Sequence, residues 1–293
     1  PIESARLVEE WGIEGDAHVG KWHRQVSMLS FEKIEAFREK GADVDFGAFG
    51  ENLVVEGFDL SKVPVGTKFQ IGEAILELTQ IGKECHSHCA IYKVMGDCIM
   101  PREGVFTRVL KGGEIKAGDE ITMLPLEKDR PFTAAVITLS DKGAAGERED
   151  KSGPLIQEML MKEGYDVIET LLLPDGEQPL KHQLMRLADQ RQVNVIFTTG
   201  GTGFAERDVT PEATQAVCDR MAMGIADAIR QYSLSITGRA MLSRAVSGIR
   251  KKTLIVNLPG SPKAVKESLE YVLPHLGHGL GILRGTDGEC GNS

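Results

Sequence analysis

The pattern of apolar and polar positions changes near residue 124. Up to that point, apolar residues form short runs separated by glycine and proline, which is typical of β-strands joined by turns. Phe31, Ile34 and Phe37 have helical spacing in FEKIEAFREKG, where Gly41 is the expected helix stop. We therefore predict a mainly β, barrel-like domain over residues 1–124. Its strand-like runs are ENLVVEG, VGTKFQIGEAILELTQIG, GVFTRVLKGG and AGDEITML.

The second part of the chain alternates strands with helices. Strands are predicted in TAAVITL, YDVIETLLL, VNVIFTT and KTLIVNL. Helices are predicted in SGPLIQEMLMKEG with Ser152 as N-cap, PLKHQLMRLADQ, PEATQAVCDRM with Thr210 as N-cap, and PKAVKESLEYVL. This alternation predicts a three-layer α/β domain over residues 132–285, with a mostly parallel sheet and helices on both faces. The polar stretch 125–131 is the expected linker, and 286–293 a tail.

Composition narrows the classes of function. The chain has 293 residues, 41% of them hydrophobic, which is enough for two cores. A net charge of -9 without a basic half argues against nucleic acid as a partner. No apolar run approaches the roughly 20 residues needed to span a bilayer, so we expect a cytoplasmic protein without membrane contact. Three of the five cysteines crowd into Cys85, Cys89 and Cys98, which favours reactive or metal-binding thiols over a disulfide framework.

A glycine-rich segment, TTGGTGFAERDVTPEAT, follows the third predicted strand of the second domain. Gly200, Gly201 and Gly203 would leave backbone N–H groups accessible to an anion, whereas a tight strand-to-helix turn is the alternative interpretation. The segment lacks the Gly-Lys-Ser/Thr of a P-loop, and Glu206 replaces the last glycine of a dinucleotide fingerprint. We therefore predict an anion-binding loop of another kind.

Two acidic residues accompany this loop. A carboxylate beside an anion site is repulsive unless a cation lies between them, so Asp208 predicts a bound Mg²⁺. Asp175, in LLLPDGEQP, ends the second strand and is expected beside Asp208 at the same sheet edge. The alternatives are a helix-capping role for Asp208 and a plain Pro-Asp-Gly turn at Asp175.

Two further strand ends carry polar residues. ITLSD offers Ser140 and Asp141, and IVNLPGSPKAV offers Asn257, Gly260, Ser261 and Lys263. A helix N-terminus with a serine cap and a nearby lysine is a phosphate site, although an N-cap alone is the simpler interpretation of Ser261.

Five motifs in order resemble the molybdopterin-binding family of MogA, MoaB and the gephyrin G domain: VITLSDKGAAGEREDKSGP, LLLPDGEQ, TTGGTGFAERDVTPEAT, SRAVSGIR and LIVNLPGSPKAV. The resemblance implies a molybdopterin adenylyltransferase that uses ATP and is a homotrimer. The helix AVKESLEYVLPHL has an apolar stripe that is a candidate surface for this association, packing in the core being the alternative. It assigns Asp175 and Asp208 to magnesium and catalysis. It assigns substrate and nucleotide binding to Ser140, Asp141, Thr199, Gly200, Gly201, Thr202, Gly203, Pro259, Gly260, Ser261 and Lys263.

The first domain has its own candidate chemistry in IGKECHSHCAIYKVMGDCIMPREGVF. Its thiols, with His86 and His88, are compatible with a zinc site or with inert buried cysteines. Three arginines are candidates for lowering a thiol pKa and holding an anion, solvated surface charge being the alternative. They are Arg24, Arg102 and Arg108.

The segments GIEGDAHVGKWHRQVSML, GAFGENLVVEGFDL and GVFTRVLKGGEIKAGDEI resemble the MOSC domain of molybdenum-cofactor sulfurases. The resemblance implies that a cysteine carries sulfur or ligates the molybdenum of a bound cofactor, and Cys85 matches the family position. It further implies a cysteine desulfurase and a molybdenum-insertion protein as partners. Because such domains have a strand before the segment that corresponds to LVEE, we expect this one to lack its first strand. The two resemblances together predict a fused molybdenum-cofactor assembly protein, with a non-catalytic cofactor carrier as the rival hypothesis.

Overall fold

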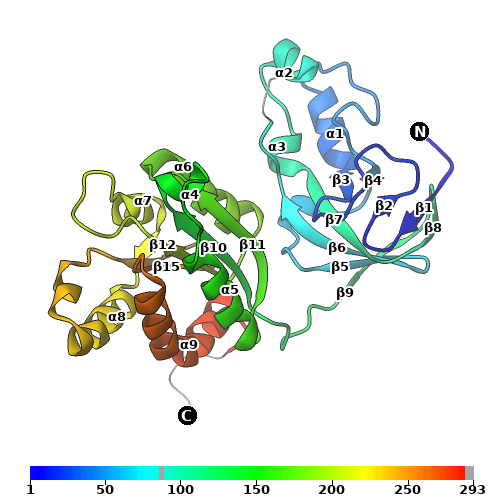
Figure 1. Ribbon diagram of the computed structural model, residues 1–293. Helices are drawn as coiled ribbons and strands as arrows, with labels where there is room; N and C mark the ends of the chain where they lie inside the picture. The colour runs from blue at the N-terminus through cyan, green and yellow to red at the C-terminus, as the bar shows by residue number, and fades with distance from the viewer. Residues whose placement is uncertain (86–88, 288–293) are drawn as a thin grey trace. The chain divides into compact units, whose positions relative to one another are not determined.

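The computed structural model describes residues 1–85 and 89–287. The chain divides into two compact units, Pro1–Glu127 and Lys128–Ser293, which are drawn in Figure 1. Across the described ranges, no helix combines the length and apolar character needed to cross a membrane.

A six-stranded mixed sheet forms the centre of the C-terminal unit, in the order β11-β10-β12-β15-β14-β13. Four neighbouring strands are parallel: β11 (Asp166–Leu173), β10 (Thr133–Leu139), β12 (Val195–Thr199) and β15 (Thr253–Leu258). The prediction of a mostly parallel sheet misses two antiparallel strands at one side, β14 (Ser247–Arg250) and β13 (Arg220–Met221). A two-residue turn joins β14 to β15, with Lys251 in the left-handed region at φ 52°.

Helices cover both faces of this sheet, because its buried strands alternate their side chains between two cores (Figure 1). Val136 and Phe197 pack with α5 (Ser152–Lys162), α8 (Met223–Ile236) and α9 (Pro262–Arg284). On the opposite face, Ile137 and Ile196 pack with α6 (Glu177–Met185) and α7 (Thr210–Val217). The three-layer prediction is thus confirmed in its architecture. Shorter elements are α4 (Asp141–Ala144), the π-helical turn η2 (Arg186–Gln190) and the 3₁₀ turn η3 (Gly238–Leu242).

Several predicted helix ends are wrong. The last helix does not stop before Pro274 but runs on to Arg284, because Leu276 and Leu280 continue its buried face. Ser152 and Thr210 are the first helical residues rather than N-caps. Asp150 instead accepts hydrogen bonds from the N–H groups at the start of α5, at 3.0 Å.

The N-terminal unit is a curled sheet that does not close into a barrel. Its larger sheet has the order β4-β3-β7-β6-β5-β9, and β2-β1-β8 form a second, three-stranded sheet. The edge strands β4 and β9 do not pair with each other, so the barrel-like prediction reduces to a half-barrel. Two irregularities in the β6–β7 register provide the curvature. The strands are β1 (Ser4–Val8), β2 (Gly12–Ile13), β3 (Val26–Ser30), β4 (Leu53–Val55), β5 (Lys68–Ile71), β6 (Ala74–Ile81), β7 (Val105–Lys111), β8 (Gly113–Lys116) and β9 (Ile121–Leu124).

Short helices cover one side of the half-barrel. The predicted helix is present as α1 (Phe31–Arg38), whereas α2 (Ala90–Met95), α3 (Met100–Glu103) and the 3₁₀ turn η1 (Leu60–Lys62) are not predicted by the apolar pattern. Phe37 of α1 meets Phe49 edge-on, with ring centroids 5.6 Å apart. This small core also contains Cys98 and Phe106, so it supports the cysteine-rich segment.

Asn257 in β15 is a fully buried polar junction of the C-terminal unit. Its Nδ2 donates to the hydroxyls of Thr198 and Thr214 at 2.9 Å, and its Oδ1 accepts the N–H of Val246 at 3.2 Å. It therefore joins β12, α7 and the segment that leads into β14. The sequence presents it as a polar strand end, but the structure gives it a scaffolding role.

We predict that Asn257→Leu lowers the free energy of unfolding of the C-terminal unit by about 2–4 kcal/mol, because three buried partners lose their hydrogen bonds. Thr214→Val, which removes only one of these bonds, should cost less. Urea unfolding followed by circular dichroism measures both losses. Trp11 and Trp22 lie in the other unit, so their fluorescence transition is an internal control. Equal stability of Asn257→Leu and the parent protein would contradict the scaffolding role.

Candidate functional site

The glycine loop, Gly200–Gly203, follows β12, and its glycines are required by close packing. Gly200 and Gly201 have φ values of 95° and 63°. A Cβ at Gly200 would lie 2.4 Å from the carbonyl oxygen of Leu139, and one at Gly201 would lie 2.4 Å from the Thr210 hydroxyl. A Cβ at Gly203 would come within 2.8 Å of the Asp208 carboxylate. The tight-turn alternative therefore accounts for the glycines themselves, and a ligand must be argued from what the loop presents.

Arg244, which precedes β14, donates hydrogen bonds to the carbonyl groups of the glycine loop. Its Nε donates to the Gly203 oxygen at 2.7 Å, its backbone N–H donates to the Thr202 oxygen at 3.0 Å, and its guanidinium also contacts the Asp208 oxygen. From the other side, Thr210 donates its hydroxyl to the Gly200 oxygen at 2.9 Å and its N–H to the Gly201 oxygen at 3.1 Å. The carbonyl groups of all four loop residues therefore accept hydrogen bonds from the protein itself.

The N–H groups of the loop have no such partners. In the part of the chain that the structure describes, the N–H groups of Gly201, Thr202 and Gly203 make no hydrogen bond. Because their carbonyls are turned into the protein, these three donors are available to an external acceptor. A run of backbone donors of this kind binds anions such as phosphate.

Three carboxylates gather beside the loop. The N–H of Asp141, after β10, donates to Asp175 Oδ2 at 3.2 Å, and the N–H of Asp175, after β11, donates to Asp141 Oδ1 at 2.9 Å. Burial raises the pKa of Asp175, and the charges of Asp141 and Asp208 raise it further. The carboxylate of Asp208 accepts the N–H of Ala205 at 2.9 Å within the turn after the loop. Neighbouring strand ends therefore bring these acids together.

Arg207 is the cation that faces this acidic group. Its Nε lies 4.0 Å from Asp175 Oδ2, and its own side chain is 71% exposed, against 11% for Asp175. The Arg207 charge lowers the pKa of Asp175, opposing burial. In the part of the chain that the structure describes, this long contact is the only ion pair of Arg207, and an exposed pair of this kind is weak.

The remaining polar residues of the predicted site take capping and loop-bridging positions. Ser140 Oγ accepts the N–H of Gly143 at 3.1 Å and caps α4, while Ser261 Oγ accepts the N–H of Ala264 at 3.3 Å and caps α9. The N-cap alternative for Ser261 is thus realised. Lys263 has an 82% exposed side chain, 3.8 Å from Glu267.

The loop after β15 packs directly on the glycine loop. Thr199 donates its hydroxyl to the Pro259 oxygen at 2.7 Å, and Ser152 donates to the Gly260 oxygen at 3.0 Å. A Cβ at Gly260 would lie 3.5 Å from the Gly200 Cα. The start of α9, the start of α5 and the glycine loop therefore share one edge of the sheet.

Sequence reasoning missed Arg207 and Arg244 as site residues. Both stand in motifs that resemble the family, but a lone arginine beside a strand has no spacing pattern that reveals its target. The loop also presents Phe204, which is 71% exposed at its tip.

In the N-terminal unit, the three clustered thiols have different surroundings. Cys85, after β6, and Cys89, before α2, are exposed, whereas Cys98 is buried with Phe106, next to Ile91 and Met95 of α2. Hydrogen bonds from the N–H groups of Tyr92 and Ile91 and from the Cys98 thiol hold the pKa of Cys89 below its usual value. Burial raises the pKa of Cys98. Cys89, whose pKa is lowered, therefore lies next to Cys98, whose pKa is raised.

The three candidate anion-binding arginines are not equivalent. The Arg24 guanidinium lies 5.6 Å from the ring centre of Phe106, which packs in the same core as Cys98. Arg102 forms a bidentate ion pair with Asp97, with both bonds at 2.9 Å, and Arg108 Nε lies 2.6 Å from a Glu77 carboxylate oxygen. Arg102 and Arg108 therefore each already contact a carboxylate.

The zinc alternative involves His86 and His88, which lie outside the described residues. Over residues 1–85 and 89–287, no group of three or more histidine, cysteine or acidic side chains has an arrangement that would hold a metal.

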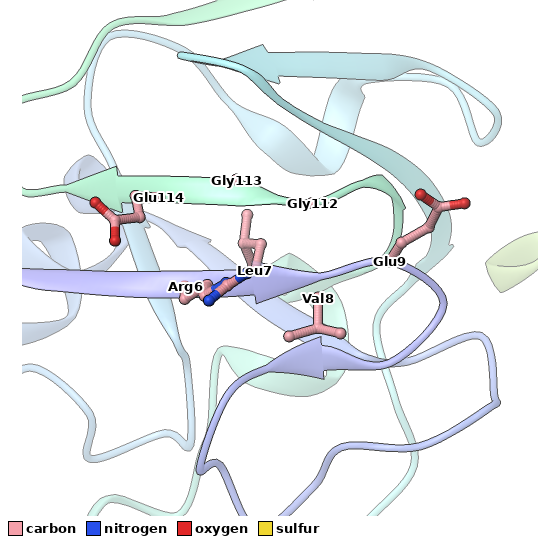
Figure 2. A pocket seen from close by; sticks show the side chains of 7 residues that line it. All are labelled: Arg6, Leu7, Val8, Glu9, Gly112, Gly113 and Glu114. Carbon is pink, nitrogen blue, oxygen red and sulfur yellow. The ribbon is translucent and has the colours of Figure 1, made fainter.

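A surface hollow of about 480 Å³ in the N-terminal unit contains none of the candidate residues. It lies along β1 and β8 and is lined by residues 6–9 and 112–114. Figure 2 shows Glu9 and Glu114 at its opposite ends, with Leu7 and Val8 between them. Its lining contains no thiol, hydroxyl or imidazole side chain.

Comparisons with known proteins agree with this division. The family model of the probable molybdopterin binding domain matches residues 135–278, and that of the MOSC domain matches residues 15–122. The molybdopterin adenylyltransferase of Helicobacter pylori is 40% identical over 153 residues, which are 52% of this chain and 87% of that protein. The chain belongs to the molybdopterin adenylyltransferase family. It carries a MOSC domain in addition, as the sequence resemblances predict.

Other members give the same result. The molybdopterin adenylyltransferase of Haemophilus influenzae is 45% identical over 139 residues, covering 47% of this chain and 71% of that protein. The crystal structure of the molybdopterin biosynthesis enzyme MoaB from Thermus thermophilus is 45% identical, covers 53% of this chain and 97% of that chain, and superposes with a TM-score of 0.51. Both similarities concern the C-terminal unit.

We predict that Arg244→Lys frees the glycine loop while leaving the fold intact, because a lysine cannot reach the Gly203 and Asp208 carbonyls together. Hydrogen exchange of the hydrogen-bonded amides of Ala205 and Asp208 should accelerate by roughly tenfold or more, the equivalent of one or two lost hydrogen bonds. Peptides of α6 should exchange at the parent rate. Arg239→Lys, in the exposed turn η3, is the matched control. Unchanged exchange in the loop would show that Arg244 does not anchor it.

Proposed function

We propose that the C-terminal unit transfers AMP from ATP to molybdopterin and releases pyrophosphate. The observation that carries this proposal is the set of open N–H groups at Gly201, Thr202 and Gly203 beside Asp175 and Asp208. Backbone donors suit a polyphosphate, and the carboxylates suit the cation that accompanies it. The family membership supports the same reaction.

The reaction needs little covalent help from the protein. An oxygen of the pterin's phosphate attacks the α-phosphorus of ATP, one phosphorus–oxygen bond forms, and the bond to the departing pyrophosphate breaks. Positioning and charge neutralisation supply most of the catalysis in such transfers. We assign the polyphosphate to the glycine loop, and the pterin phosphate to the start of α9 with Ser261, Lys263 and Ser140.

Asp175 and Asp208 are the proposed magnesium ligands. Mg²⁺ is commonly held by one or two carboxylates together with waters and substrate phosphates, so this pair of acids fits it. When bound, the ion would neutralise charge that develops on the phosphates. Arg207 is positioned to leave Asp175 and contact the polyphosphate at that moment.

We predict that Asp175→Asn and Asp208→Asn each lower the rate of adenylylation by about a hundredfold or more, because a positioned metal contact is worth several kcal/mol in the transition state. Pterin affinity should stay near the parent value. The measurement is pyrophosphate release with purified molybdopterin and Mg-ATP.

Asp227→Asn, at an exposed carboxylate that pairs with Arg230, is the matched control. Parent-rate pyrophosphate release by both site variants would remove the metal role. If the parent protein binds molybdopterin but releases no pyrophosphate, the rival function of a cofactor carrier replaces adenylylation.

For the N-terminal unit we propose a role in binding the molybdenum cofactor or transferring sulfur to it, carried by its thiols. The MOSC family match supports this role, and Cys85 is the position that the sequence resemblance assigns. We also propose that a cysteine desulfurase is the sulfur donor and that a molybdenum-insertion protein is the next enzyme. The proposed location of the protein is the cytoplasm.

We further propose that the chain forms a homotrimer through the C-terminal unit, although not through the surface that the sequence indicates. The apolar stripe of AVKESLEYVLPHL is buried in the unit's own core. Exposed apolar side chains gather instead on α8 and η3, where Met241 is 67% exposed. They are Met223, Leu234, Ile236, Met241 and Leu242. Such a patch is typical of an association surface.

We predict that light scattering at micromolar concentration gives a mass three times that of the 31.9 kDa chain. The double variant Met241→Glu, Leu242→Glu should lower it to that of a monomer, because charges replace apolar contacts in the interface. Met161→Glu, an exposed methionine on α5, is the control. A monomeric parent protein would contradict the proposal.

A further inference from the structure

Two of the three clustered thiols in the N-terminal unit are in direct contact. The Cys89 and Cys98 side chains hydrogen-bond to each other. Cys89 is exposed, whereas Cys98 is only 6% exposed. The pair thus consists of one thiol that a large reactant can reach and one that it cannot.

We propose that Cys89 and Cys98 form a sulfur-exchanging dithiol, in which Cys89 accepts sulfane sulfur from a persulfide and Cys98 releases it as hydrosulfide. This inference rests on the proposed sulfur-handling role of the N-terminal unit. It differs from the expectation at Cys85, because it gives the accepting role to another residue.

The exchange consists of two displacements. The Cys89 thiolate attacks the outer sulfur of a persulfide R–S–SH, forms Cys89–S–SH, and releases R–S⁻. The Cys98 thiol then loses its proton and attacks the Cys89 sulfur, so that a Cys89–Cys98 disulfide forms and HS⁻ leaves and takes up that proton. Two thiols are oxidised and one sulfane sulfur is reduced to sulfide, so the electrons balance without a further oxidant.

The surroundings of the pair favour this order of events. Cys98 packs among Ile91, Met95 and Phe106, which exclude a bulky persulfide. Once Cys89 carries the sulfur, its own contact with Cys98 makes the second attack intramolecular, and a short separation between reacting atoms is worth a large effective concentration. Gly96, in the left-handed conformation at φ 68°, ends α2 between the two cysteines.

Cys98 is also fixed from the backbone. Its N–H donates to Asp97 Oδ1 at 2.8 Å, and the same carboxylate is held by Arg102. The buried thiol therefore has a defined position, while Cys89 belongs to the exposed end of the segment. A disulfide between them would close a loop that contains only α2 and the turn after it.

The test uses the full chain and glutathione persulfide as the probe. Released sulfide is quantified, and tryptic peptides are analysed by mass spectrometry under non-reducing conditions. We expect sulfide release together with a Cys89–Cys98 disulfide. Cys98→Ser should retain a persulfide on Cys89 and lower sulfide release at least tenfold. Cys98→Ala provides a second variant if the serine disturbs the buried site.

Cys218→Ser, in the other unit, is the matched control and should behave as the parent protein. Persulfide found on Cys85, with sulfide release lost in Cys85→Ser and kept in Cys89→Ser, would overturn the dithiol and leave the proposed function of the unit standing. Sulfane sulfur on none of the three cysteines would overturn both. Trp11 and Trp22 lie in the N-terminal unit, so their fluorescence, recorded on the same samples, shows that this unit is folded in each variant.

Discussion

The orientation of the glycine loop is the constraint on which the C-terminal site depends. A peptide group cannot direct both its carbonyl and its N–H to the same side, so fixing the loop carbonyls on Arg244 and Thr210 leaves the N–H groups available to a ligand. These partly buried arginine–carbonyl contacts are costly to lose, because the released carbonyl and guanidinium groups would both need new partners. The fold thus prepares the donors before any anion arrives, which is the preorganisation that phosphoryl transfer needs.

The carboxylates beside this loop are held close together at a cost in electrostatic repulsion. Asp175 and Asp208 are partly buried beside the exposed Asp141, and burial together with repulsion from the other two carboxylates raises the pKa of Asp175. A proton taken up by Asp175 therefore binds more tightly in the folded chain than in the unfolded one. The repulsion is present above that raised pKa and fades as the pH falls through it. Arrangements that disfavour the free protein in this way are typical of sites completed by a cation.

The sequence predicts the architecture of the C-terminal unit because its central strands are apolar on both faces. TAAVITL matches β10 residue for residue, and the family motifs mark the ends of β11, β12 and β15. The antiparallel strand β14 is missed because SGIR contains one apolar side chain and depends on pairing with β15. The extension of α9 is missed because Pro274 signals an end locally, whereas burial of Leu276 and Leu280 decides the outcome globally.

The site residues also differ in whether local sequence is enough to predict them. Residues that a chain pattern places at strand ends, such as Asp175 and Asp208, are accessible to sequence reasoning, but Arg244 acts on a loop 41 residues away and needs the sheet to bring it there. The thiols illustrate the limit again, since Cys85 comes after β6, a strand that the pattern predicts, and the short segment 82–84. The contact between Cys89 and Cys98 arises from α2, a helix too short for its periodicity to be recognised. The reactivity of a thiol depends on which other thiol it contacts, and such contacts are set by packing rather than by local sequence. Packing here places Cys98 in contact with Cys89.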